Sequence, residues 1–114
     1  MELEFKTNKL KLKCENGTFF NKKNVPMNTK LVHKIRELEQ ATSLLDIKIN
    51  KSLHLHKLKW NRKYELAIDI DGRKNVFRII FETIPKDIVY NDFCNDAKFK
   101  EITKIKILEV ADYH

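Results

Sequence analysis

Alternating apolar residues on both sides of a tight-turn dipeptide constrain the fold of this chain more than any other feature. From Leu66 to Ile70 every second residue is apolar, as in a strand with one buried face. Asp71 and Gly72 follow, a pair typical of hairpin turns, and residues 76–81 form a second apolar run. The pattern predicts an antiparallel hairpin within a β-sheet.

Further segments are expected to extend this sheet. Residues 2–13 alternate charged and apolar side chains, and residues 53–58 do the same with leucine, histidine and lysine, so both predict strands. The apolar run 102–110 predicts a last strand. Its alternation changes phase near Ile107, which indicates either a β-bulge or a central strand buried on both faces.

One helix is predicted between these strands, because four apolar residues at spacings of four, four and three share a helical face. A loop is expected before it over residues 18–26, a turn after it over residues 44–47, and a polar excursion over residues 82–101. We expect a single α+β domain over residues 1–114, a small and mostly antiparallel sheet with N-terminal helices packed on one side. The four helical residues are Met27, Leu31, Ile35 and Leu38.

Length and composition restrict the class of protein. The 114 residues are enough for one hydrophobic core, and no apolar stretch approaches the ~20 residues that span a bilayer. The first residues have no signal-peptide core, so a cytoplasmic protein without membrane contact is expected. Cys14 and Cys94 are far apart and form no CxxC motif, which argues against a disulfide framework and a zinc-binding cysteine pair.

Positive charge is concentrated in residues 48–63. The chain carries a formal net charge of +7, and this stretch contains six cations and two histidines without a carboxylate. Such a stretch is typical of a phosphate-rich partner, but it is also found as a solvated face of lysine-rich proteins. Composition leaves both readings open. The cations are Lys48, Lys51, Lys57, Lys59, Arg62 and Lys63.

The last three residues add groups that exchange protons. The final predicted strand runs directly into Asp112, Tyr113 and His114, so we expect an acid, a phenol and an imidazole at one edge of the sheet. Arg78 lies in the returning strand of the hairpin, on a face expected to be buried. A buried arginine must either pair with a carboxylate such as Asp69 or Asp112, or line a concave site.

These motifs, taken in order, resemble the RelE/ParE superfamily of bacterial type II toxins, specifically the HigB-like "killer protein" branch. The branch pattern is roughly Leu-His-x-Leu-Lys-Gly-Asp-Arg, then a strand with Arg-Ile-x-Phe, then a last strand ending in Asp-Tyr-His. Trp60-Asn61 replaces the usual Gly-Asp, and Trp60 either stacks on a base or packs at the sheet edge. The matching pieces are Leu55-His56-Lys57-Leu58-Lys59, Arg62, Arg78-Ile79-Ile80-Phe81 and Glu109-Val110-Ala111-Asp112-Tyr113-His114.

The resemblance implies a RelE/ParE-like fold and an endoribonuclease toxin that cuts messenger RNA on the ribosome and inhibits translation. It implies no cofactor and no metal, with a cognate helix-turn-helix antitoxin, the ribosome and mRNA as partners. Histidine suits proton transfer near neutral pH, and arginine and lysine suit phosphate binding. The catalytic residues would be His56, Lys59, Arg78 and His114. The RNA-binding residues would be Lys57, Trp60, Arg62, Lys63, Asp112 and Tyr113.

Two other functions remain open for the same fold. One is a non-catalytic ParE-type toxin that inhibits DNA gyrase, although such relatives generally lack the histidine and lysine set present here. The other is an inactive member that binds RNA or the ribosome. His54 and His56 have the spacing of a metal-binding pair, but no third ligand is marked nearby in the sequence, so His54 is expected to be exposed or packed.

Overall fold

The computed structural model describes residues 1–58, 62–72 and 76–112 of the chain. Across these ranges, no helix is long and apolar enough to cross a membrane. The elements follow one another as β1 (Glu2–Phe5), α1 (Asn8–Asn16), α2 (Val25–Gln40), α3 (Leu44–Ile49), β2 (His56–Lys57), β3 (Glu65–Asp69), β4 (Phe77–Thr83), the 3-10 helix η1 (Tyr90–Cys94), α4 (Asp96–Glu101) and β5 (Lys104–Asp112).

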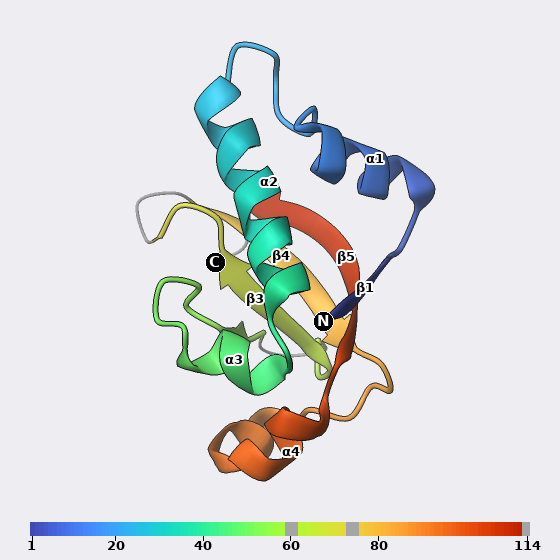
Figure 1. The fold of residues 1–114 in the computed structure, drawn as a ribbon, viewed down its shortest axis with the longest axis vertical. Helices are drawn as coiled ribbons and strands as arrows, with labels where there is room; N and C mark the ends of the chain where they lie inside the picture. The colour runs from blue at the N-terminus through green and yellow to red at the C-terminus, as the bar shows by residue number, and fades with distance from the viewer. Residues whose placement is uncertain (59–61, 73–75, 113–114) are drawn as a thin grey trace.

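The strands form one sheet in the order β1-β5-β4-β3-β2, and only the β1–β5 pair among the described strands is parallel (Figure 1). The predicted hairpin is present as β3 and β4. Glu65 pairs with Glu82 at one end of this hairpin, and Asp69 pairs with Arg78 at the other. The last strand therefore lies in the middle of the sheet, between the first strand and the hairpin.

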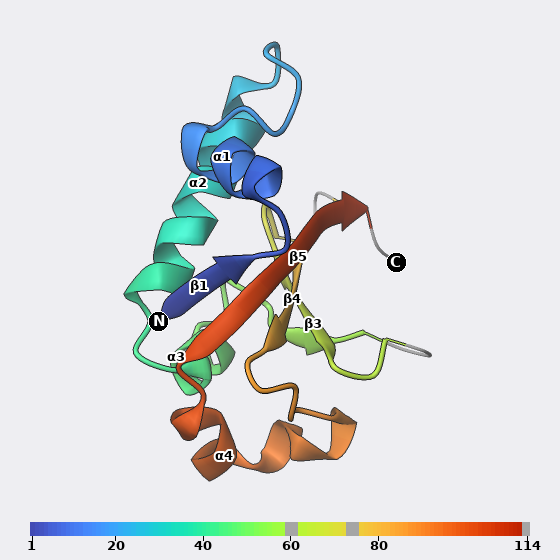
Figure 2. The ribbon, with the colours of Figure 1, turned by 90° about the vertical axis from the view of Figure 1, so that its right-hand side faces the viewer.

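The N-terminal helices cover one face of the sheet (Figures 1 and 2). Leu31 and Leu38 of α2 have no exposed surface and belong to the same apolar cluster as Ile79 and Phe81 of β4. Burial of such side chains from water supplies about 1.5–3 kcal/mol each, which makes this layer the main source of stability. The predicted α+β architecture is confirmed.

The first predicted strand is wrong beyond Phe5. Residues 8–16 form α1, because both ends of a helix are capped there. The Thr7 hydroxyl accepts a hydrogen bond from the Leu10 amide at 3.1 Å, and Gly17 adopts a left-handed conformation (φ 66°) that closes the last turn. The apolar alternation of this segment was compatible with a strand, but the caps decide for a helix.

The segment after α2 also differs from the expected turn. Residues 44–49 form the short helix α3, and the Asp46 carboxylate accepts a hydrogen bond from the Thr42 amide at 2.8 Å near its start. The strand predicted over residues 53–58 shrinks to β2. His54, just before it, has a positive φ of 50°, so the backbone turns there and cannot continue an extended strand.

The phase change in the last strand is a β-bulge. Ile80 pairs with Glu109 and Phe81 pairs with Ile107, which leaves Leu108 as the extra residue of β5. The strand is central in the sheet, but it is buried on one face only, so of the two expected alternatives the bulge is the one present. Because of the extra residue, Ile107 and Val110 both belong to the core covered by the helices.

The opposite face of the sheet carries only a small apolar patch. Leu58, Ala67 and Ile80 are buried there and form a cluster separate from the main core. Side chains paired across neighbouring strands share a face, so the partners of these residues project on the same side. We call this side, with Ala67 and Ile80 at its centre, the open face of the sheet.

Candidate functional site

A row of three paired residues crosses one end of the open face. Asp69 of β3 pairs with Arg78 of β4, and Arg78 pairs with Ala111 of β5. The Arg78 Nε atom lies 2.7 Å from Asp69 Oδ1, in a close ion pair rather than an aligned hydrogen bond. Only 1% of the Asp69 side chain and 13% of the Arg78 side chain are exposed. Of the alternatives left open for Arg78, the pairing with Asp69 is present.

The second oxygen of the same carboxylate contacts a histidine. Asp69 Oδ2 lies 3.0 Å from His54 Nδ1, and the Asp69 amide donates a hydrogen bond to the Leu53 carbonyl at 2.8 Å. His54 has its positive φ at the position where its ring contacts the Asp69 carboxylate. Asp69 therefore holds an imidazole and a guanidinium at fixed positions from the end of one strand.

His56 completes the cluster from the edge strand. It pairs with Ala67 and therefore projects on the open face. The centroids of the His54 and His56 rings are 4.9 Å apart, with 33° between the planes, and His56 Nδ1 lies 2.8 Å from the His54 carbonyl oxygen. One potential ligand atom from each of His54, His56 and Asp69 lies within 4.8 Å of the others.

The register of β5 carries the end of the described chain to this cluster. Asp112 is exposed and pairs with Phe77, one position beyond the Arg78–Ala111 pair. His56, Arg78 and Asp112 of the expected site are thus at the same end of the sheet, but Asp112 pairs with Phe77 of the main core and therefore projects on the face opposite to His56 and Arg78. Four other expected site residues lie outside the described residues: Lys59, Trp60, Tyr113 and His114.

No protein-family model and no curated protein matches this sequence.

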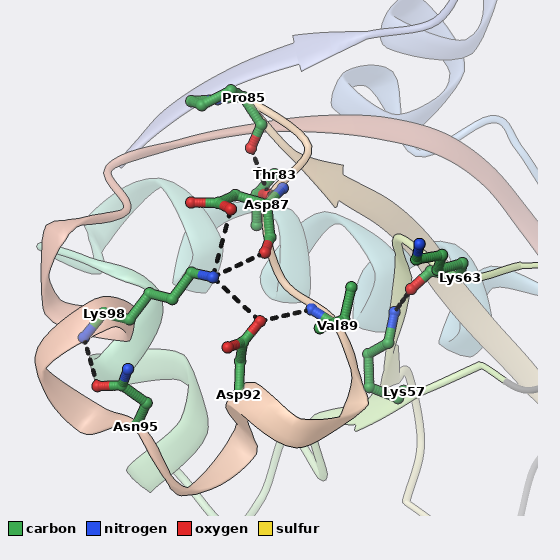
Figure 3. A network of polar contacts seen from close by, with 9 residues as sticks. All are labelled: Lys57, Lys63, Thr83, Pro85, Asp87, Val89, Asp92, Asn95 and Lys98. Atoms are coloured by element: carbon green, nitrogen blue, oxygen red, sulfur yellow. Dashed lines mark hydrogen bonds and ion pairs between the residues drawn. The ribbon is translucent and has the colours of Figure 1, made fainter.

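Lys57, expected to bind RNA, has an internal role in the structure. Its ammonium donates hydrogen bonds to the carbonyl oxygens of Lys63 and Glu65, the latter at 3.1 Å (Figure 3 draws the Lys63 contact). Burial lowers the pKa of Lys57, and the nearby carboxylates of Glu65 and Asp92 partly oppose that effect. The side chain therefore ties β2 to the chain that leads into β3.

Arg62, also expected to bind RNA, pairs with two carboxylates on the open face. It lies 2.5 Å from Glu109 and 3.2 Å from Glu65, and the hydrogen bond to Glu109 raises the pKa of Arg62. Lys63 is exposed, with its ammonium 5.2 Å from the Tyr64 ring centroid. Of the two, Lys63 presents the more accessible charge.

The other cations of the basic stretch also include both paired and exposed side chains. Lys48 donates to the Phe93 carbonyl and lies 2.6 Å from Asp96, so its charge is used to hold α3 against the 90–101 segment. Lys51 is exposed. The stretch is therefore less available to a phosphate partner than its composition suggests, because Lys48, Lys57 and Arg62 have internal partners.

A groove of about 420 Å³ lies on the open face near Arg62. Four cations and three carboxylates line it, so it does not present the uniform positive charge that favours a polyanion. Its lining residues are Lys6, Arg62, Glu65, Glu82, Lys86, Lys106, Leu108 and Glu109.

The polar excursion after β4 is organised by one lysine (Figure 3). Lys98 Nζ lies 3.1 Å from Asp92 Oδ2 and 2.9 Å from the Asp87 carbonyl oxygen. Asp92 also accepts a hydrogen bond from the Val89 amide at 2.8 Å. That backbone bond, followed by the Lys98 ammonium, lowers the pKa of Asp92, and the Asp92 carboxylate raises the pKa of Lys98. The network stabilises a segment that the sequence pattern left without assigned structure.

Sequence reasoning missed two residues of the cluster. His54 was expected to be exposed or packed, and Asp69 was considered only as an ion-pair partner of Arg78. A signal for Asp69 existed, because a carboxylate between Ile68 and Ile70 in a strand of the core must have partners. Nothing in the alternation marked the backbone turn at His54 that brings its ring to that carboxylate.

Proposed function

We propose that this chain is the toxin of a type II toxin–antitoxin system, an endoribonuclease that cuts mRNA on the ribosome and inhibits translation. One observation carries the proposal: the register of Asp69, Arg78 and Ala111 gathers a guanidinium, two imidazoles and the end of β5 at one end of the open face. The order of motifs that resembles HigB-like toxins supplies the reaction and the partners.

The cluster contains groups that metal-free RNA cleavage requires. A base takes the proton of the ribose 2′-hydroxyl, and the 2′-oxygen attacks phosphorus. The bond from phosphorus to the 5′-oxygen breaks, and an acid protonates that oxygen, leaving a 2′,3′-cyclic phosphate and a 5′-hydroxyl. In the proposal His56 and His114 transfer the protons, while Lys59 and Arg78 stabilise the charge on the phosphorane.

The contacts around these groups favour a prearranged site. Arg78 is held by Asp69 and by a hydrogen bond from Nη1 to the Phe77 carbonyl oxygen at 3.0 Å. The His56 ring lies against the His54 ring, which Asp69 positions in turn. Groups already fixed before substrate binds lose little free energy to reorganisation during reaction.

Exposed cations of the basic stretch would contact the RNA backbone. Lys63 and Lys51 are exposed enough for this role. Lys57 and Arg62 have internal partners, so they would support RNA binding by stabilising the surface on which the RNA lies. Asp112, next to the Arg78 row, would join Trp60 and Tyr113 in positioning nucleotides. A helix-turn-helix antitoxin would neutralise the protein by covering or distorting this end of the sheet.

Primer extension on a defined message bound to ribosomes tests the proposal. The unmodified chain should produce cuts within the message, and His56→Asn should reduce the rate by about 10²–10⁴-fold, the range contributed by one proton-transfer group. His33→Asn is the matched control, because His33 is an exposed histidine on α2, away from the cluster. Equal rates for the unmodified chain and His56→Asn would contradict the assignment of His56.

Pulse labelling after expression in a bacterial host distinguishes mRNA cleavage from the two other functions, gyrase inhibition and binding without activity. Protein synthesis should fall before DNA synthesis if the chain cuts mRNA. Earlier loss of DNA synthesis would favour a gyrase inhibitor, and normal growth with intact folding would favour an inactive binding member of the same fold.

A further inference from the structure

We infer that His54, His56 and Asp69 form a binding site for a divalent transition-metal ion, with Zn²⁺ as the best fit. Two imidazoles and one carboxylate are a ligand set that Zn²⁺ accepts readily. Their potential ligand atoms lie within 4.8 Å of one another on the open face. The inference concerns binding alone; a bound ion would take up the His56 imidazole that the proposed reaction uses, so it would inhibit that reaction and not take part in it.

The separation of the first two ligands is close to that of a zinc site. His54 Nδ1 and Asp69 Oδ2 are 3.0 Å apart. With bonds of about 2.0–2.1 Å in a tetrahedron, ligand atoms lie about 3.3–3.4 Å apart, so this pair needs a shift of a few tenths of an ångström. A larger movement is required of the partly exposed His56 ring, and rotation of its side chain can supply it.

Arg78 prepares the carboxylate for this role. The Arg78 Nε atom contacts Oδ1 of Asp69. The other oxygen, Oδ2, is therefore directed at His54. Asp69 is buried and anchored at its amide, so this ligand does not have to be ordered when the ion binds. Partners that orient a ligand in this way typically change metal affinity by 10–100-fold. The arginine charge also weakens the site, so we expect an exchangeable ion rather than a permanent one.

The backbone at His54 is an independent indication of a site. A φ of 50° is uncommon for a residue other than glycine, and such conformations concentrate where function requires them. Here the turn brings His54 Nδ1 to Asp69 while β2 keeps His56 on the same face.

Titration of the full, tag-free chain with Zn²⁺, followed by calorimetry, tests the site. One ion should bind per chain, and His54→Asn should lower the affinity by at least about 10-fold. Asparagine is chosen because it tolerates a positive φ, which preserves the backbone turn. His56→Asn should have a similar effect, and His33→Asn should have none.

Co²⁺ provides a second measurement on the same variants. Tetrahedral Co²⁺ absorbs strongly in the visible range, and Zn²⁺ should displace that absorption in the unmodified chain. Circular dichroism establishes whether each variant keeps its fold. If folded His54→Asn binds Zn²⁺ as tightly as the unmodified chain, or if His33→Asn loses as much affinity, the site is not formed by this cluster.

Discussion

Asp69 and Arg78 lie directly opposite each other on β3 and β4, and the carboxylate of the pair is almost completely withdrawn from water. Each charge lies within 2.7 Å of the other, so neither is buried without a counter-charge. The same carboxylate also contacts His54, so the stability of the sheet and the arrangement of the site depend on one side chain.

Replacing Arg78 by alanine should lower the free energy of unfolding by about 3–5 kcal/mol, because the buried Asp69 charge would remain without its partner. Chemical denaturation measures the loss. Lys86→Ala is the matched control, since Lys86 is an exposed cation whose removal should change stability by less than about 1 kcal/mol. An Arg78→Ala protein as stable as the control would show that the pair is not a structural requirement. Activity tests should therefore use Arg78→Lys, which keeps the charge.

Removing His114 should abolish cleavage and toxicity while leaving the fold unchanged. In the proposed reaction this terminal imidazole transfers a proton, which is worth about 10²–10⁴-fold in rate. The comparison is between the full chain and a chain ending at Tyr113, by primer extension on a ribosome-bound message and by thermal unfolding. If the shortened chain cuts at the same rate, proton transfer must be assigned to His56 and its neighbours alone.

Reversing the charge of Lys51 and Lys63 together should weaken ribosome binding and reduce its salt dependence. Both side chains are exposed. Each lost phosphate contact should lower the slope of log affinity against log salt by about 0.7–0.9. Lys57 is unsuitable for this test, because its ammonium holds backbone carbonyls. Lys22→Glu with Lys23→Glu is the control of equal charge change, on an exposed loop before α2. Equal binding by both double variants would mean that the basic stretch does not meet the ribosome.

Asp92→Asn should destabilise the chain at neutral pH and have progressively less effect in acid. The pKa of Asp92 is lowered in the folded state, so its contribution is present above its unfolded pKa, about 3.9, and is lost as pH falls through the lower folded value. Thermal unfolding of both proteins between neutral pH and acid measures this. Asp87→Asn should have a smaller effect, since Asp87 is more exposed and its carboxylate lies 3.3 Å from Lys98. A difference that persists at the lowest pH would contradict the linkage.

Periodicity predicted the parts of the fold in which burial alone decides structure. The helix α2 and the β3–β4 hairpin were predicted correctly, because the spacing of their apolar residues matches the positions that are buried in the core. Examples are Leu31 and Ile35 in the helix and Ile68 and Ile79 in the hairpin. The strand predicted over residues 2–13 is wrong from residue 8 onward, since the deciding interactions there are caps at Thr7 and Gly17 rather than apolar spacing.

The candidate site was only partly predictable for a different reason. Arg78 was recognised because a charge in an apolar strand requires explanation, and its pairing with Asp69 was among the expected outcomes. His54 and Asp69 are fifteen positions apart in the sequence, and their contact depends on a backbone turn at His54. No local sequence pattern predicts that turn. Sequence spacing identifies residues on one face more readily than residues brought together by an unusual φ.

The extra residue at Leu108 has a consequence for how this chain tolerates change. Because Phe81 pairs with Ile107 and Ile80 pairs with Glu109, a chain without Leu108 would keep every pair between β4 and β5 and would restore the regular alternation of side chains along β5. Ala111 would still pair with Arg78, and Val110 would still pair with Ile79 in the core. A single-residue deletion at the bulge would thus be tolerated better than a deletion elsewhere in β5, where the residues on one side of the deletion would have to change face.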